Sequence, residues 1–396
     1  MKIRRLANEE RPTTSWRLQS YAFEPSPTQP DEVARFHDFL PYLADSITLV
    51  VQDGDETLAA VSAIPMRQNV RGVVHPMAGI SGVASHPLAR RQGHVRTLLT
   101  QLLGELRDEG YAVSSLYPFR PSFYARFGYA ALPQPRTVSF SPADLGEWLR
   151  ADLPGELRLQ RIRDGYDTYR GFTERLVASR HGFCVLPDSR AVHLRDDDKR
   201  WLVSASHEGE VIGAVTYRID DHGGTLRADD LLTVGPLGRA LLLQFFARHV
   251  DQVARISAIV AADETPELWA ADLATHTEST VAFPGAVAPM ARLLTLDGLH
   301  GLPTGPGRVR VEIVDDPLLA GSYLLDGTDG QLTVSRADAP ALPAATLTAA
   351  GISALVYGVA DPDDLPLRGF GTVPPSAATQ LRSLFPRTTP HLSTTF

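Results

Sequence analysis

One tyrosine in this chain is well placed for acid chemistry. Tyr124 lies in the aromatic run Phe123-Tyr124-Ala125-Arg126-Phe127-Gly128-Tyr129. Unperturbed phenols and thiols have pKa values of about 10 and about 8.5, so a phenol can share or donate a proton to a departing thiolate at modest cost. A packed core aromatic is the alternative reading of Tyr124. The residue therefore suits transfer from a thioester, provided that a thioester site lies nearby.

A candidate site for a phosphate-bearing carrier lies 30 residues upstream. Arg90, Arg91 and Arg96 surround Gly93, which allows a sharp backbone turn. A helix that begins near His94 directs its free N–H groups and positive dipole end at a bound anion. Arginines around a glycine also occur on solvated loops, so the flanking elements matter.

The flanking elements favour a buried strand that feeds this loop. Residues 79–84 form a short run without charged residues, as expected of a buried strand. Leucines then recur at helical spacing from residue 98 to residue 106, and Gly110 is placed to end the helix. Residues 111–117 read as the next strand. The predicted order is strand, anion loop, helix, strand and aromatic run.

In this order the residues resemble the GNAT acetyltransferases, and within them the Eis-type N-acetyltransferases of bacteria, over the whole chain. The resemblance implies acetyl-CoA as the acetyl donor. The residues that it assigns to the donor are Val83, Ala84 and Ser85 for the pantetheine arm and acetyl carbonyl, Arg91, Gln92, Gly93, His94, Val95 and Arg96 for the pyrophosphate, and Phe119 and Arg120 for further contacts. Val95 departs from the pattern, because a small residue is usual there.

The resemblance also implies two catalytic groups. Tyr124 matches the general acid, and the terminal carboxylate of Phe396 matches the group that organises the amine proton. A carboxylate with a pKa of about 3.5 is a weak base for an amine of pKa about 10.4. We therefore expect it to bind the cation and pass its proton through water. A frayed tail is the alternative, so residues 386–395 must form an ordered arm if Phe396 is to reach Tyr124.

Composition restricts the partners. The chain has 396 residues and a net charge of -8, which argues against nucleic acid and suits cationic substrates. The N-terminus has no apolar core typical of a signal peptide, and no apolar run is long enough to span a membrane. We expect a cytoplasmic protein. Cys184 is the only cysteine, and the histidines lack ligand spacing, so we expect no intrachain disulfide and no metal.

The element pattern predicts an α/β (α+β) chain of three units. The boundaries are 1–135 for a catalytic GNAT fold, 136–286 for a degenerate second GNAT fold, and 287–396 for a unit that resembles a sterol-carrier domain. The second unit repeats the strand-strand-helix order, but its loop at residues 234–238 lacks arginines. Its charged run at residues 195–200 reads as a solvated turn.

Members of the Eis type acetylate several amines of aminoglycosides and form homohexamers, so the resemblance implies a cationic amine acceptor and a homo-oligomer. Asp31, Glu32 and Asp38 lie near the expected entrance, but acids at helix starts are common for dipole reasons, and we do not count them as site residues. Three alternatives stay open: acetylation of protein lysines, lipid carriage by the third unit, and non-catalytic binding of a cation. Fold alone does not decide among them.

Overall fold

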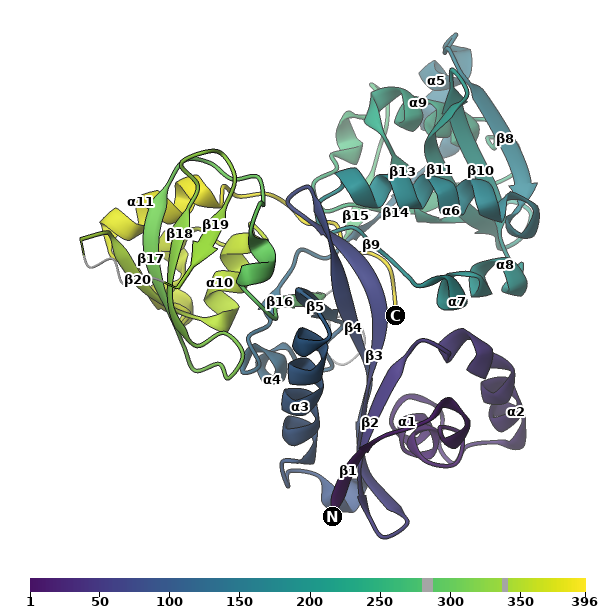
Figure 1. Ribbon diagram of the computed structural model, residues 1–396. Coiled ribbons are helices and arrows are strands. Elements are labelled where there is room, and N and C mark those ends of the chain that lie inside the picture. The colour runs from purple at the N-terminus through teal and green to yellow at the C-terminus, as the bar shows by residue number, and fades with distance from the viewer. Residues whose placement is uncertain (280–287, 337–340) are drawn as a thin grey trace.

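The computed structural model describes residues 1–279, 288–336 and 341–396. Three lobes surround a central junction, and each is built on its own β-sheet (Figure 1). Sheets and helices are mixed in every lobe, which confirms the predicted α/β class. The predicted boundary at residues 286 and 287 lies outside the described residues.

The first lobe is built on a mainly antiparallel sheet in the order β1-β2-β3-β4-β5-β16-β6, with β9 paired to β3. Only β4 and β5 run parallel. The bounds are β1 (Lys2–Arg5), β2 (Ile47–Asp53), β3 (Glu56–Val70), β4 (Val73–Ser85), β5 (Val113–Leu116), β6 (Ala130–Ala131), β9 (Cys184–Val185) and β16 (Met290–Leu293).

Four helices accompany this sheet: α1 (Ser15–Phe23), α2 (Pro30–Phe39), α3 (His94–Asp108) and α4 (Pro121–Ala125). Helix α3 begins after Gly93, whose φ is 89°, and it ends before Gly110, whose φ is 94°. Both conformations favour glycine. The leucines of α3 are buried against the sheet. The predicted limits of this helix are confirmed.

The second lobe repeats the arrangement with the sheet order β15-β7-β14-β12-β11-β10-β8, and β13 pairs with β11. Its strands are β7 (Arg136–Phe140), β8 (Glu156–Arg161), β10 (Trp201–His207), β11 (Glu210–Ile219), β12 (Thr225–Asp230), β13 (Leu232–Thr233), β14 (Arg255–Val260) and β15 (His276–Glu278). Its helices are α5 (Gly146–Arg150), α6 (Ile162–Ser179), α7 (Asp188–Ala191), α8 (His193–Asp197) and α9 (Gly235–Ala247).

The third lobe has a sheet in the order β19-β18-β17-β20-β21 with two helices. The bounds are β17 (Arg308–Val314), β18 (Gly321–Asp326), β19 (Thr333–Ser335), β20 (Ala344–Thr348), β21 (Gly371–Thr372), α10 (Ala349–Val356) and α11 (Pro375–Leu384). Every residue of α10 is buried, so this helix forms the centre of the lobe.

Three segments cross between lobes. Strand β16 lies within the stretch that we assigned to the third unit, yet it pairs with β5 and β6 of the first sheet. Strand β9 follows the second-lobe helix α6 but pairs with β3. The C-terminal tail leaves the third lobe and ends beside β3 (Figure 1). The lobes are thus interlocked, because strands bond to the nearest open sheet edge whatever their place in the chain.

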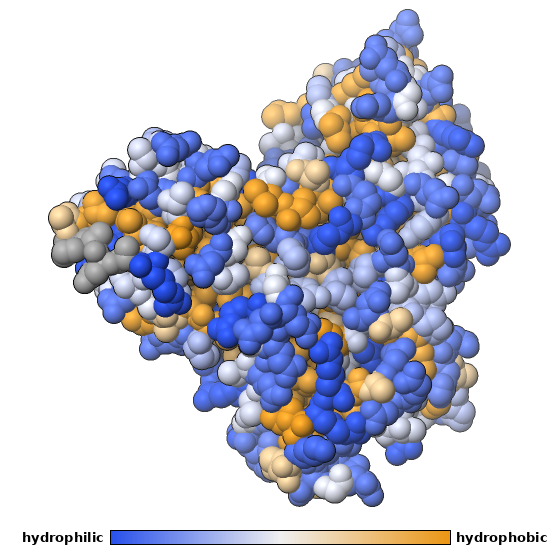
Figure 2. Space-filling view, in the orientation of Figure 1, coloured by the Kyte–Doolittle hydropathy of each residue, from blue (hydrophilic) through white to orange (hydrophobic). Residues whose placement is uncertain are grey.

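The surface is largely polar. On the face drawn in Figure 2, hydrophilic side chains dominate and several apolar patches lie where the lobes meet. Within the described residues, no helix is both long and apolar enough to cross a bilayer.

Candidate active site

The site begins where β4 and β5 separate. Their pairing runs from Met77 and Val113 to Ile80 and Leu116 and then ends, while β4 continues to Ser85. Gly82 interrupts the register of β4 with β3 and has a φ of 58°. Its carbonyl accepts a hydrogen bond from Gln19 of α1 at 2.9 Å. The backbone of residues 82–85 is therefore turned away from β5 and available to a ligand.

The arginine-flanked loop lies beside this opening. Arg91 and Gly93 both have positive φ values, 65° and 89°, so the chain turns sharply before α3. A Cβ on Gly93 would meet nothing within 4 Å, which means that open space faces the start of the helix. Free N–H groups at a helix N-terminus favour an anion in such a space.

One cavity of about 930 Å³ joins the strand and the loop. Every residue that the sequence assigned to the acetyl donor lines this cavity, namely Val83, Ala84, Ser85, Arg91, Gln92, Gly93, His94, Val95, Arg96, Phe119 and Arg120. The prediction missed Ala22 and Phe23 from α1, and Ser122, Phe123 and Arg126 near α4. Phe23 is 59% exposed, an unusual state for an apolar ring, but α1 itself was not predicted from the sequence.

Tyr124 lies on α4, directly behind the cavity wall. Its ring packs edge-on against Phe119 at 5.5 Å and Phe123 at 5.0 Å between centroids. The side chain is buried, and this burial raises its pKa above the usual value, with a further contribution from Tyr129. Tyr124 therefore stays protonated throughout the neutral range. The aromatic core that we gave as the alternative role of Tyr124 is also present. Tyr124 therefore packs within this core and lies beside the cavity.

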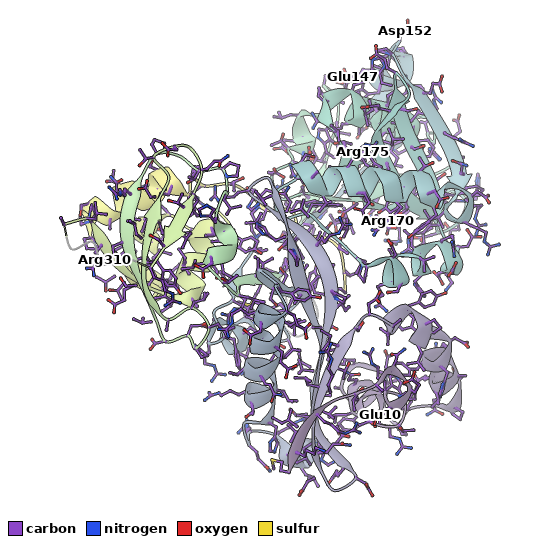
Figure 3. All side chains as sticks on the ribbon, in the orientation of Figure 1. Glu10, Glu147, Asp152, Arg170, Arg175 and Arg310 are labelled. Carbon is purple, nitrogen blue, oxygen red and sulfur yellow. The ribbon has the colours of Figure 1, made fainter. Side chains whose placement is uncertain are left out.

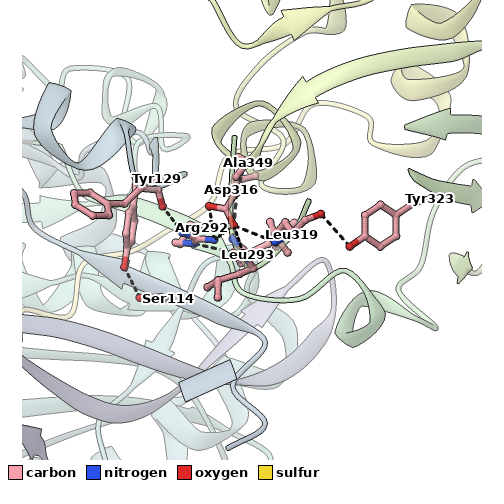
Figure 4. A network of polar contacts seen from close by, with 11 residues as sticks. Ser114, Tyr129, Arg292, Leu293, Asp316, Leu319, Tyr323 and Ala349 are labelled. Carbon is pink, nitrogen blue, oxygen red and sulfur yellow. Dashed lines mark hydrogen bonds and ion pairs between the residues drawn. The ribbon is translucent and has the colours of Figure 1, made fainter. Parts of the chain in front are cut away.

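A buried ion pair supports the segment that follows Tyr124. Arg292 of β16 pairs with Asp316 of the third lobe at 3.1 Å, and it also donates to the carbonyl of Phe127 (Figure 4). Tyr129 exchanges a hydrogen bond with Ser114 of β5 at 2.7 Å. The turn at Gly128 is thereby fixed from two sides, which holds α4 against the sheet.

Phe396 lies on the same sheet, against the end of β5. Its ring meets the Tyr117 ring edge-on at a centroid distance of 5.5 Å. It also lines a small cavity of about 120 Å³, together with residues of β3, β4 and α1 that include Ser62, Ser81 and Gln19. Tyr124 thus contacts Phe119, and Phe396 contacts Tyr117. Both of these neighbours lie in the segment that follows β5.

The tail before Phe396 is an extended, bonded arm. The N–H of His391 donates to the carbonyl of His181 at 2.8 Å, and Thr394 Oγ1 donates to the carbonyl of Cys184 at 3.0 Å. Tyr117 donates its hydroxyl hydrogen to the carbonyl of Thr394 at 3.2 Å. Residues 390–392 are buried. The arm required by the sequence hypothesis is therefore present, whereas its Thr-rich composition alone would favour mobility.

An open basin of about 610 Å³ lies between α2 and α8. Four aromatic rings, His193, Arg35 and five carboxylates line it; the rings and carboxylates belong to Trp16, Phe36, Phe39, Tyr42, Glu24, Glu32, Asp38, Asp196 and Asp197. Arg35 lies 3.8 Å from Glu32 and offsets part of the negative charge. Phe36 also lines the small cavity at Phe396, so the two hollows adjoin. Glu32 and Asp38 were considered and left out on sequence grounds. They line a basin only because α8, more than 150 residues away in the sequence, contributes its other side.

The run at residues 195–200 differs from its prediction as a solvated turn. Residues 195–197 belong to α8, and Asp196 accepts a hydrogen bond from Tyr42 at 2.9 Å. Asp198 has a φ of 42° and pairs with Arg161. Asp196 therefore connects the second lobe to the first, whereas Asp198 forms its ion pair within the second lobe.

Helix α9 of the second lobe packs closely on β11. A Cβ on Gly238 in the first turn of α9 would lie 2.2 Å from the carbonyl oxygen of Ile212. Gly235, at the start of α9, has a φ of 74°, and a Cβ there would meet nothing within 4 Å. The loop at residues 234–238 therefore has an open start like that of α3, but it lacks the arginines.

Cys184 is buried beneath the tail, and burial raises the pKa of its thiol to about 12. Such a thiol is a poor nucleophile. Within residues 1–279, 288–336 and 341–396, no group of three or more His, Cys, Asp or Glu side chains is arranged to hold a metal ion.

Comparison with known proteins gives the same answer as the geometry. A family model described as "Acetyltransferase (GNAT) domain" matches residues 2–132. N-acetyltransferase Eis of Mycobacterium tuberculosis strain H37Ra is 37% identical over 86 residues, which span 20% of this chain and 21% of that protein. An uncharacterized N-acetyltransferase of Streptomyces avermitilis is 26% identical over 359 residues, 83% of this chain and 82% of the relative.

The crystal structure of Eis1 from Mycobacterium abscessus superposes with a TM-score of 0.77 at 18% identity and covers all of both chains. At that identity the likeness concerns the fold. The alignment with the mycobacterial Eis sequence covers only about a fifth of that relative. Residues 2–132 therefore match the GNAT acetyltransferase domain, and the whole chain has the fold of Eis1.

Proposed function

We propose that this protein transfers the acetyl group of acetyl-CoA to a primary amine of a cationic small molecule. One observation carries the proposal: all the residues assigned to the donor line one cavity that runs from β4 to the start of α3 and adjoins Tyr124. Arg91 and Arg96 supply positive charge for a pyrophosphate, and the free edge of residues 83–85 can bond an extended pantetheine arm.

The chemistry balances with the groups at the site. The amine nitrogen attacks the thioester carbonyl carbon, the new C–N bond forms, and the C–S bond breaks. The thiolate takes one proton, for which Tyr124 is the donor. The ammonium loses two protons. One passes through water to the terminal carboxylate of Phe396 before the attack, and the other leaves the nitrogen after the C–N bond forms and restores the hydroxyl of Tyr124. The raised pKa of Tyr124 keeps its hydroxyl proton in place until the thiolate develops.

The acceptor approaches from the basin between α2 and α8. Its carboxylates attract cations, and its aromatic rings suit an ammonium group packed on a ring face. The small cavity at Phe396 shares Phe36 with the basin, so we propose that one amine of the acceptor reaches the terminal carboxylate past this ring. An aminoglycoside offers several amines on one rigid cation and fits this description, with acetylation at more than one position as a consequence. A protein lysine offers a single exposed amine.

The proposal has further parts that follow from the Eis-type fold. The protein acts in the cytoplasm, where acetyl-CoA is present, and forms a homohexamer. The second lobe has lost donor binding and closes the acceptor side. The third lobe, with the resemblance to sterol-carrier domains, delivers the tail.

Release of CoA thiol from acetyl-CoA tests the function. The acceptors are a panel of aminoglycosides, linear polyamines and a lysine-containing peptide, with mass spectrometry counting the acetyl groups added. The expected result is saturable turnover with polycationic small molecules and little with the peptide. Turnover with the peptide alone would favour lysine acetylation. Failure to bind acetyl-CoA would contradict the enzyme function.

A further inference from the structure

The second lobe binds the C-terminal tail through one carboxylate. Asp230 is the last residue of β12, and its Oδ2 accepts a hydrogen bond from the hydroxyl of Ser393. The same oxygen lies 3.7 Å from Nε2 of His391. Its other oxygen, Oδ1, is buried and has no hydrogen-bond partner among the described residues. A carboxylate removed from water in this way is costly unless charged or polar groups face it.

The tail is held along its length by the segment that precedes β9. His391 is 5% exposed, and its ring stacks on Phe183 at a centroid distance of 6.2 Å. Gly182 has a φ of 80°, and a Cβ there would lie 2.5 Å from the backbone nitrogen of His391. Close approach of the two backbones therefore requires glycine at this position.

Helix α6 holds the residues that follow β9. Arg170 donates to the carbonyl of Leu186 at 3.0 Å and pairs with Asp188 at 2.8 Å (Figure 3). The strand that faces the tail is thus anchored on the second lobe on one side and bonded to β3 on the other.

Ser393 is three residues from the chain end. An extended chain spans at most about 3.3–3.6 Å per residue, so an anchor at Ser393 restricts the terminal carboxylate to within roughly 11 Å of a fixed point. Tyr117 then fixes Thr394 and the ring of Phe396. Without the anchor at Ser393, the chain end after His391 would be held only by the hydrogen bonds of Thr394 and by the ring of Phe396.

We propose that Asp230 is a positioning residue that holds the C-terminal carboxylate in the acceptor site. This rests on the proposed acetyl transfer. It also assigns a task to the second lobe, whose loop at residues 234–238 lacks the arginines of the donor loop. This lobe supplies the clamp that holds the chain terminus in place.

The first test measures the tail itself and needs no activity. Carboxypeptidase A releases a C-terminal phenylalanine only from a free chain end, so its rate on the native protein reports how often the tail detaches. We expect slow release from the wild type and release about 10- to 150-fold faster from Asp230→Ala, the range that corresponds to the loss of a hydrogen bond to a charged group. Asp230→Asn keeps an acceptor oxygen and should lie between them.

Asp229→Asn is the matched control. It makes the same change on the neighbouring residue, whose carboxylate binds Arg200 and Thr216, each at 2.6 Å. Release from this variant should equal that from the wild type. Equal release from Asp230→Ala and the wild type would overturn the clamp.

The second test asks whether the clamp acts through the carboxylate. In the full chain, Asp230→Ala should lower kcat about tenfold and leave the KM for acetyl-CoA unchanged. In a chain that ends at Thr395, the same substitution should have no further effect, because two changes that remove one function do not add. An equal loss of kcat in the full chain and in the chain that ends at Thr395 would show that Asp230 has only a structural role. A wild type without acetyl transfer would refute the proposed function, while the carboxypeptidase result would still decide the clamp.

Discussion

The ring of Phe396 occupies the space that a side chain on Gly79 would fill. A Cβ on Gly79 would lie 2.8 Å from Cδ2 of Phe396 and the same distance from Sδ of Met66. Gly79 is in β4, opposite Ser115 of β5, just before the two strands separate. A strand residue without a side chain thus creates the seat for the chain terminus, more than 300 residues later in the sequence.

Replacing Gly79 with alanine should displace the ring. The φ of Gly79 lies outside the left-handed region, so alanine fits the backbone and the effect comes from contact alone. Overpacking of this kind costs about 1–3 kcal/mol. We expect kcat to fall at least fivefold with an unchanged acetyl-CoA Kd. Gly104→Ala is the control, because its Cβ would find Leu318 at an ordinary 3.9 Å. A Gly79→Ala enzyme with full kcat would refute the seat.

Substitutions in the loop before α3 should affect donor binding and leave the stability of the fold largely unchanged. Arg91 has a positive φ, so Arg91→Gly removes the charge without backbone strain. Arg96→Gln removes the second charge within the helix. Each charge-assisted bond is worth about 1.5–3 kcal/mol, so we expect the Kd for CoA to rise roughly 10-fold or more in each variant. Dephospho and pantetheine analogues separate the phosphate contributions. Unaltered CoA affinity in both variants would place the pyrophosphate elsewhere.

Stability should fall below neutral pH because of His181. Burial lowers its pKa to about 4, and its Nδ1 accepts a hydrogen bond from the N–H of Arg71 at 3.0 Å, which an imidazolium cannot do. The unfolded chain binds a proton below about pH 6.5 and the folded chain does not, so stability is lost as the pH falls from 6.5 to 4, by up to about 3 kcal/mol.

Urea unfolding at pH 7 and pH 5 measures this loss. His181→Gln cannot titrate and should show a smaller difference between the two pH values than the wild type. The control is His222→Gln at an exposed position. This variant should show the same difference in stability between pH 7 and pH 5 as the wild type. A wild-type difference in the His181 variant would contradict the assignment.

The ion pair of Arg292 and Asp316 should be critical for folding. Both side chains are almost fully buried, at 2% and 5% exposure. Asp316→Ala leaves a buried guanidinium unpaired and should cost about 3–5 kcal/mol, whereas replacing both residues with apolar ones of similar volume should cost much less. Thermal unfolding of the single and double variants tests this. Equal destabilisation by Asp316→Ala and by the double replacement would show that lost packing, and not the unpaired guanidinium, accounts for the change in stability.

Local signals in the sequence grouped the residues that line the cavity between β4 and α3. Gly93, its arginines and the leucine repeat of α3 lie within one short stretch, so spacing alone set their geometry. The strand at residues 79–84, the helix after Gly93 and the following strand were predicted from this stretch in the same way. Helix α1 was missed because its residues Ser15–Phe23 show little apolar contrast between faces.

Long-range features could not be predicted in this way. Strand β16 was assigned to the third unit because it follows the second unit in the chain. Its pairing with β5 could not be predicted, since the sequence does not show which sheet edge is free. The acidic basin joins α2 to α8, and neither half has a motif of its own. No signal in the sequence distinguishes Asp230 from other aspartates at strand ends. Its role becomes visible only from its hydrogen bond with Ser393 of the tail. Each depends on contacts between segments that are distant in sequence.

The most direct test of the account compares thiol release from acetyl-CoA by four proteins with one polycationic amine. They are the wild type, Tyr124→Phe, a chain extended by one glycine after Phe396, and Phe396→Leu. The extension keeps the ring and moves the carboxylate away, whereas Phe396→Leu keeps the carboxylate.

The account predicts that Tyr124→Phe and the extended chain lose about 10²–10⁴-fold in kcat, as expected when a general acid or a proton acceptor is removed, with unchanged CoA affinity. Phe396→Leu should lose far less. Full turnover by Tyr124→Phe and by the extended chain would contradict the account, because the acid and the terminal carboxylate would then have no part in the transfer.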